Sequence, residues 1–107
     1  MTSNSEPIYS SLALDPDYAD LVKDFVNAFA SKTETIHQCV SEKNLVLLQR
    51  TMHQMRGACG SYGFPTLSKS AAEVEERLQA GGTLESVEES ISEFLNLLAR
   101  ASAEKPY

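Results

Sequence analysis

The sequence predicts an all-α protein that folds as an antiparallel, up-down-up-down four-helix bundle. Apolar residues recur at three- and four-residue spacing along four stretches, which is the periodicity of amphipathic helices. The loops between these stretches are short, so consecutive helices must lie side by side and run in opposite directions. No stretch alternates as a strand would, and 107 residues suffice for one core but not for two.

Residues 1–14 are expected to precede the bundle as an N-terminal arm or a short extra helix. Residues 1–6 are polar and are expected to fray. The apolar residues that follow predict a segment lying on the bundle, either helical or extended: Ile8, Tyr9, Leu12 and Leu14.

The bundle is expected to span residues 15–101, with residues 102–107 as a tail. Asp15-Pro16 predicts the start of the first helix, because aspartate caps helices and proline is favoured at the first helical position. A continuous apolar stripe predicts that this helix is long and reaches about Glu42. Its members are Tyr18, Leu21, Val22, Phe25, Phe29, Ile36 and Val40.

Capping and terminating residues delimit the other three helices. Asn44 and Thr83 have side chains that can cap the second and fourth helices, and Pro65 or Thr66 opens the third. Glycines end the second helix near Gly60 to Gly63 and the third at Gly81-Gly82. Each predicted helix carries its own apolar stripe, so all four can contribute to one core.

Composition and charge exclude several classes of function. The net charge is −6 and the nine Lys and Arg residues are scattered, which argues against binding to nucleic acid or to an anionic membrane. The N-terminus lacks a signal-peptide pattern and no apolar run could span a bilayer, so the protein is expected to be cytoplasmic. Cys39 and Cys59 fall on predicted helices and form no close pair, which predicts reduced core thiols.

The second predicted helix has two unlike faces. One is an apolar stripe made by Leu45, Leu48, Met52, Met55 and Cys59. The other surrounds His53 with small, polar and basic residues, together with the apolar Val46 one turn further back: Gln49, Arg50, Arg56, Gly57 and Gly60. A glycine inside a helix costs about 1 kcal/mol relative to alanine. Helix termination explains Gly60 and Gly63 but not Gly57, which indicates that another molecule approaches the backbone beside His53.

The residues around His53 limit the kinds of reaction in which it could take part. His37 and Cys39 are two residues apart and point to nearly opposite sides of a helix, so no chelating pair for a metal is predicted. A small bundle with an open face offers no oxyanion hole for a hydrolytic triad. The imidazole can itself act as a nucleophile and hold a phosphoryl group, whose charge Arg56 could offset.

The motif His53-x-Met55-Arg56-Gly57-Ala58-Cys59-Gly60-x-Tyr62-Gly63 resembles the signature of histidine phosphotransfer (HPt) domains of multistep two-component phosphorelays. The likeness extends from about Asp15 to Arg100 through helix number, helix lengths and loop positions. The resemblance implies a four-helix bundle that presents a phospho-accepting histidine, His53. It also implies that Arg56 stands where the family usually has lysine, and that Gly57 is the small residue after it.

The same resemblance implies the partners and the cofactor. A response-regulator receiver domain, or a hybrid sensor kinase that carries one, would dock on the His53 face and bring the aspartyl phosphate and Mg²⁺. No cofactor is then expected in this chain. The expected docking contacts are Val46, Gln49, Arg50, Gly57, Gly60 and Phe64, although Phe64 could instead fold under the hairpin and join the core.

Glu75 is predicted to orient His53 on two grounds. By resemblance, it occupies the position on the next helix that hydrogen-bonds the histidine ring. Independently, His53 and Glu75 each lie about ten residues from the intervening turn, which places both roughly 15 Å from it and level with each other. The alternative is that Glu73, Glu75 and Glu76 form a solvated charged face.

The predicted function is therefore that of a phosphorelay intermediate. The protein would accept a phosphoryl group on His53 from a receiver-domain aspartate and pass it to another receiver domain, as a carrier rather than a full enzyme. The alternative, from a different class, is a phosphate-independent helical adaptor or dimerisation module that uses the His53 face only for binding.

Overall fold

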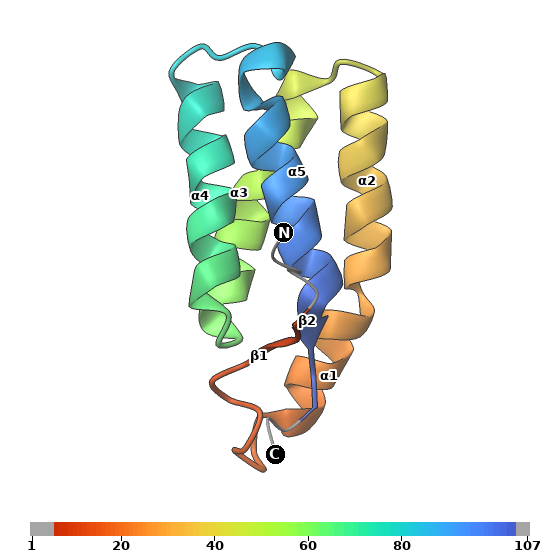
Figure 1. Ribbon diagram of the computed structural model, residues 1–107, viewed down its shortest axis with the longest axis vertical. Helices are drawn as coiled ribbons and strands as arrows, with labels where there is room; N and C mark the ends of the chain where they lie inside the picture. The colour runs from red at the N-terminus through yellow and green to blue at the C-terminus, as the bar shows by residue number, and fades with distance from the viewer. Residues whose placement is uncertain (1–5, 105–107) are drawn as a thin grey trace.

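The computed structural model describes residues 6–104, which form a bundle of antiparallel helices as predicted (Figure 1). Its four long helices are α2 (Phe29–Ser41), α3 (Leu45–Ser61), α4 (Pro65–Gln79) and α5 (Leu84–Arg100). They run alternately up and down, and α5 lies in front of α3 with α4 and α2 on either side (Figure 1). The most extensive contact between two helices is that of α3 with α4, which together form the helical hairpin that contains the His53 motif.

The first helix begins later than predicted. Asp15 does start a capped turn, because its carboxylate accepts a hydrogen bond from the backbone N–H of Asp17 at 2.9 Å and its carbonyl oxygen accepts one from Ala19 N–H at 2.9 Å, but the regular helix begins only at Ala19. The chain therefore makes a turn over these residues, and α1 (Ala19–Asn27) follows it with Tyr18 at the cap position. The predicted start signal is therefore present at Asp15-Pro16, and the regular helix begins a few residues after it.

The prediction of one continuous first helix was also wrong, because α1 ends at Asn27 and α2 starts at Phe29. Neither proline nor glycine stands at the break, so no local signal marks it. The two rings that flank it, Phe25 and Phe29, meet edge to face with centroids 4.8 Å apart, and Phe25 also stacks on Tyr62 at 4.5 Å. The break lies where packing of these rings against the α3–α4 turn sets the chain direction.

The predicted helix boundaries elsewhere are confirmed. The Asn44 side chain accepts a hydrogen bond from Leu47 N–H at 3.1 Å, and the Thr83 hydroxyl accepts one from Ser86 N–H at 3.2 Å. Pro65 is the first residue of α4. Gly81 ends that helix with a φ of +89°, a conformation that glycine adopts without the steric cost other residues incur. These signals are local, and the sequence alone sufficed to find them.

The N-terminal arm is extended rather than helical over its first described part. The two-residue strand β1 (Ile8–Tyr9) pairs in parallel with β2 (Ala101–Ser102), a contact between the two ends of the chain that the pattern did not predict. Ser11 N–H then donates to the carbonyl oxygen of Gly63 at 2.8 Å, so the arm also covers the α3–α4 turn. Residues 1–5, most of the segment that was expected to fray, lie outside the described residues. Residues 105–107 of the predicted tail also lie outside them.

The core contains the predicted stripes and both cysteines. Leu48, Met52 and Met55 are fully or almost fully buried, and Cys39 and Cys59 are buried free thiols, as expected. Burial in this apolar surrounding raises the pKa of Cys59 to about 12, because desolvation disfavours the thiolate. The pKa of Cys39 is raised as well, first by burial and second by the nearby charge of Glu42.

Candidate functional site

His53 lies in the middle of α3 on the face turned away from the core. Its side chain is 73% exposed, whereas Met52 and Met55 on the same helix are at most 1% exposed. This difference follows from the helical period, which places the apolar stripe on one side and the histidine on the other. An exposed imidazole on a rigid helix is accessible to a partner molecule.

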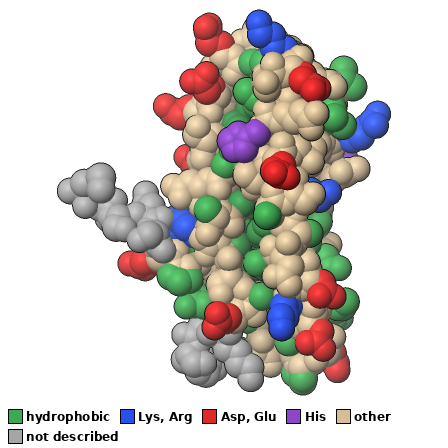
Figure 2. Space-filling model, turned by 90° about the vertical axis from the view of Figure 1, so that its right-hand side faces the viewer, with side chains coloured by type: hydrophobic (Ala, Val, Ile, Leu, Met, Phe, Trp, Pro, Cys, Tyr) green, Lys and Arg blue, Asp and Glu red, His purple; other side chains and the backbone are tan. Residues whose placement is uncertain are grey.

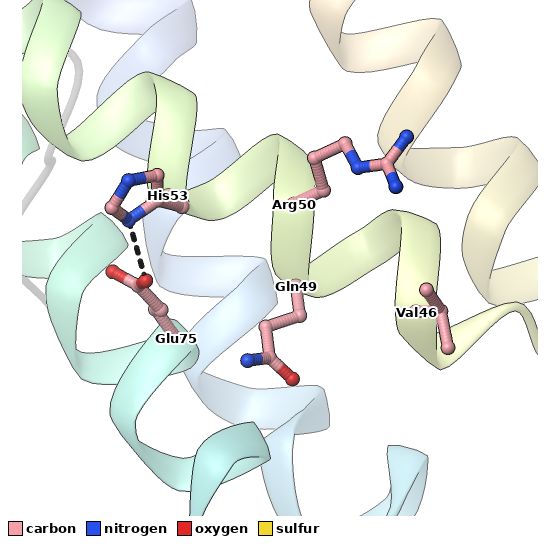
Figure 3. Close-up of a pocket in the computed structure, with 5 residues that line it drawn as sticks. All are labelled: Val46, Gln49, Arg50, His53 and Glu75. Carbon is pink, nitrogen blue, oxygen red and sulfur yellow. Dashed lines mark hydrogen bonds and ion pairs between the residues drawn. The ribbon is translucent and has the colours of Figure 1, made fainter.

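Glu75 reaches the histidine from α4. One oxygen of its carboxylate, Oε2, lies 2.7 Å from Nδ1 of His53 (Figure 3). The carboxylate is held within the α3–α4 interface, and its side chain is only 4% exposed. The two residues are therefore level with each other, as the hairpin predicted, and the alternative in which Glu75 belongs to a solvated face is wrong.

The contact with Glu75 orients the imidazole ring. An ionised carboxylate can only accept hydrogen bonds, so Nδ1 is the protonated nitrogen and donates its proton to Oε2. The other ring nitrogen, Nε2, then carries a lone pair. The arrangement therefore presents a nucleophilic nitrogen on a histidine whose ring is fixed from behind.

Two further side chains hold the same carboxylate. Arg56 donates from Nη1 to Oε1 of Glu75 at 3.2 Å, and the same guanidinium nitrogen lies 3.8 Å from the Glu76 carboxylate. Gln79 donates from Nε2 to Oε2 of Glu75 at 3.4 Å. Gln79 was missed from the sequence, although its position one helical turn after Glu75 is a spacing that could have identified it.

The glycines near His53 differ in what surrounds them. A Cβ added to Gly57 would meet no atom within 4 Å, so nothing inside the described chain requires glycine there. A Cβ at Gly60 would lie 3.4 Å from Oγ of Ser68, whose hydroxyl donates to the carbonyl of Arg56 at 2.7 Å. Gly60 therefore supports the close approach of α4, whereas Gly57 leaves a bare patch of helix on the surface.

A shallow hollow of about 230 Å³ lies beside His53. It is lined by Val46, Gln49, Arg50, His53 and Glu75. Figure 3 shows Gln49 extending toward the side on which Glu75 lies, and Arg50 pointing the other way. Val46 is 73% exposed, which is unusual for an apolar side chain. Three of the predicted docking contacts, Val46, Gln49 and Arg50, thus lie beside His53 on the outer side of α3.

Phe64 is a correction to the predicted docking contacts. The side chain is fully buried, with its ring centroid 6.4 Å from that of Phe25 and 6.2 Å from that of Phe29. The turn after α3 folds back and carries the ring under the hairpin, where the aromatic cluster surrounds it. Phe64 is a core residue and cannot contact a partner in this conformation.

The described residues show little that would support other kinds of site. Between residues 6 and 104, no group of three or more His, Cys, Asp and Glu side chains is arranged to hold a metal ion. None of the helices described there combines the length and apolarity needed to cross a membrane. On the molecular face shown in Figure 2, basic side chains are interspersed with acidic ones and do not gather into a patch.

Comparison with known proteins identifies one family. The family model described as "Hpt domain" matches residues 20–104, which include all of α2 to α5 and the His53 motif. Searches of curated proteins and of solved structures returned no match.

Proposed function

Because the chain belongs to the Hpt domain family, which acts in histidine phosphotransfer within phosphorelays, we propose that His53 is its phospho-accepting residue. In this proposal Nε2 of His53 takes a phosphoryl group from the aspartyl phosphate of one receiver domain. It then passes the group to an aspartate of another receiver domain. The protein is a carrier, and the partner receiver domain supplies Mg²⁺.

The observation that carries the proposal is the 2.7 Å contact between Nδ1 of the exposed His53 and the buried Glu75 carboxylate. A surface histidine with no function needs no buried partner, since water satisfies its ring nitrogens. Burying a carboxylate is costly unless several donors hold it, and here three side chains do so. The result is an imidazole whose Nε2 is available to an incoming phosphorus atom.

Arg56 has the charge and the position to assist the transfer. It lies three residues after His53 on the same side of α3, and its side chain is 45% exposed. A guanidinium can pair with two phosphoryl oxygens at once, which offsets the charge that develops during transfer. In the unphosphorylated protein Arg56 pairs with Glu75, so it would divide its hydrogen bonds between the carboxylate and the phosphoryl group.

The receiver domain docks, in this proposal, on the outer face of α3. Val46 offers an apolar contact, Gln49 and Arg50 offer polar ones, and Gly57 leaves space for the partner's backbone, whereas Ser68 of α4 lies beside Gly60. The hollow of about 230 Å³ beside His53 is smaller than the pockets that usually enclose a small molecule, which fits a site completed by a second protein.

The test is phosphorylation of the intact protein. Incubation with phosphoramidate, or with a phosphorylated receiver domain, is expected to yield an acid-labile, base-stable phosphoryl adduct. The His53→Gln variant should carry no label. His37→Gln is the matched control, because His37 is the other histidine and is exposed on α2. Absence of label on the wild type, or equal label on His53→Gln, would favour the phosphate-independent adaptor or dimerisation module.

A further inference from the structure

We propose that phosphorylated His53 keeps its Nδ1 proton, as an imidazolium held by Glu75, so that the phosphoryl group enters and leaves without any proton transfer. The inference rests on the proposed function and concerns the regulation of the same site. It is carried by the way in which both oxygens of the Glu75 carboxylate are held.

The Glu75 carboxylate cannot easily turn away from the ring. Oε2 accepts from His53 Nδ1 at 2.7 Å, and Oε1 accepts from Arg56 at 3.2 Å. The side chain is 4% exposed, so water cannot replace a lost donor. If the phosphorylated ring released its Nδ1 proton, a nitrogen lone pair would face a buried carboxylate oxygen. Two acceptors at that separation repel each other, and the carboxylate would lose its shortest hydrogen bond.

The chemistry of transfer then balances without a proton. The Nε2 lone pair forms the P–N bond, the P–O bond to the receiver aspartate breaks, and its electron pair leaves on the aspartate oxygen. The ring becomes positively charged in this step, and Glu75 stabilises that charge through the same Nδ1–H bond as before. In the reverse step the P–N electron pair returns to Nε2, and neutral imidazole is the leaving group. A ring without the Nδ1 proton would have to leave as an anion.

The charged groups around the ring agree with this assignment. The hollow beside His53 is lined only by residues of α3 and α4. The acidic groups Glu75 and Glu76 come from α4, and Arg56 of α3 pairs with both of them. Arg50, also of α3, points away from the ring in Figure 3. Arg56 can neutralise part of the phosphoryl charge, whereas among the charged groups of the described residues it is Glu75 that forms an ion pair with the ring. Glu75 is thus a positioning residue whose charge, and not only its hydrogen bond, matters.

Glutamine at this position separates the two properties. Its amide oxygen can accept the Nδ1–H bond of the unphosphorylated ring, so Glu75→Gln should still take label from phosphoramidate. It carries no negative charge and cannot hold an imidazolium as strongly. Glu73→Gln is the matched control, because Glu73 lies on the same helix, loses the same charge, and pairs with Arg77 and Ser90 instead of His53.

The experiment measures the phosphorylated full-length chain. For the wild type, ¹⁵N NMR of the ring should find a proton on Nδ1, and the hydrolysis rate of the adduct should stay within about twofold from about pH 6 to about pH 9. In Glu75→Gln the rate should fall by about tenfold per pH unit once the ring loses its proton within this range. Glu73→Gln should follow the wild type.

A wild-type ring that lacks the Nδ1 proton at about pH 8, above the usual range for a free imidazolium, would overturn the inference. So would a Glu75→Gln profile parallel to that of the wild type. The NMR measurement needs no variant, so a folding defect in Glu75→Gln leaves the inference testable. If phosphoramidate leaves no label on wild-type His53, the proposed function fails and this inference fails with it. If His53 is labelled but its ring lacks the Nδ1 proton, only this inference is overturned.

Discussion

The two halves of the His53 motif meet different demands, although one follows the other directly, from the middle of α3 to the turn after it. In the first half, His53, Arg56 and Gly57 face solvent, and a Cβ at Gly57 would touch nothing. In the second half, Cys59 is fully buried, and a Cβ at Gly63 would lie 2.5 Å from Oγ of Ser10. These three residues of the first half are accessible from outside the chain, whereas Cys59 and Gly63 of the second half pack within it.

This difference shows that one residue type can be present for two unrelated reasons. Gly63 has a φ of +84° and is covered by the N-terminal arm, so backbone conformation and close packing both require glycine. Gly57 sits in regular helix with open space around it, so neither backbone conformation nor packing in the described chain requires glycine there. Substitutions at the two positions should therefore have effects of opposite sign on stability.

The largest expected effect is that of Gly63→Ala. The alanine must adopt a left-handed backbone conformation, and its methyl group clashes with Ser10 and with the backbone N of Ser11. We expect a loss of about 3 kcal/mol in the free energy of unfolding, measured by urea denaturation. A loss below about 0.5 kcal/mol would show that the arm moves aside freely, and would weaken the contrast between the two halves.

The next effect concerns transfer rather than stability. Glu75→Ala should slow phosphotransfer from a phosphorylated receiver domain by at least about tenfold, as expected when a carboxylate that orients a functional histidine is removed. Single-turnover transfer kinetics measure this effect. Glu73→Ala, on the same helix and away from the ring, is the control. Unchanged transfer in Glu75→Ala would contradict the orienting role.

The buried half of the motif should also respond to pH. The pKa of Cys59 is raised from 9.0 to about 12 in the folded protein, so folding favours the protonated thiol. The contribution of this protonated thiol to the free energy of unfolding is fully present below pH 9. It is lost as the pH rises from 9 toward about 12, because the thiol ionises at lower pH in the unfolded chain than in the folded protein.

This loss should follow a slope of at most about 1.4 kcal/mol per pH unit in the free energy of unfolding. Urea denaturation at several alkaline pH values measures it. The Cys59→Ala variant, although less stable overall, should show a shallower slope. Identical slopes for the two proteins would mean that Cys59 does not cause the alkaline sensitivity.

The smallest effect is expected for Gly57→Ala. Alanine favours the helix over glycine by up to about 1 kcal/mol, and nothing opposes the added methyl group, so thermal unfolding should shift upward. Transfer from a receiver domain should become slower, because the methyl group stands where the partner would approach. A variant that is more stable and equally fast in transfer would remove the argument that Gly57 serves docking.

Local interactions explain how much the sequence alone could predict. The helix caps at Asn44 and Thr83, the proline at the start of α4 and the glycine at its end depend on residues at most a few positions apart. The outward position of His53 follows from helical period alone. The fold class and the residue at the centre of the site were therefore determined by signals that no tertiary contact overrides.

Contacts between distant parts of the chain decided the rest. The break between α1 and α2, the pairing of Ile8 with Ala101 and the burial of Phe64 all depend on segments that meet only after folding. The hairpin predicted that Glu75 would be level with His53, but only helix packing determined that its carboxylate is buried and held by Arg56 and Gln79. The sequence determined where the histidine faces, and the tertiary structure decided what holds it, because burial and side-chain distances depend on how whole helices pack.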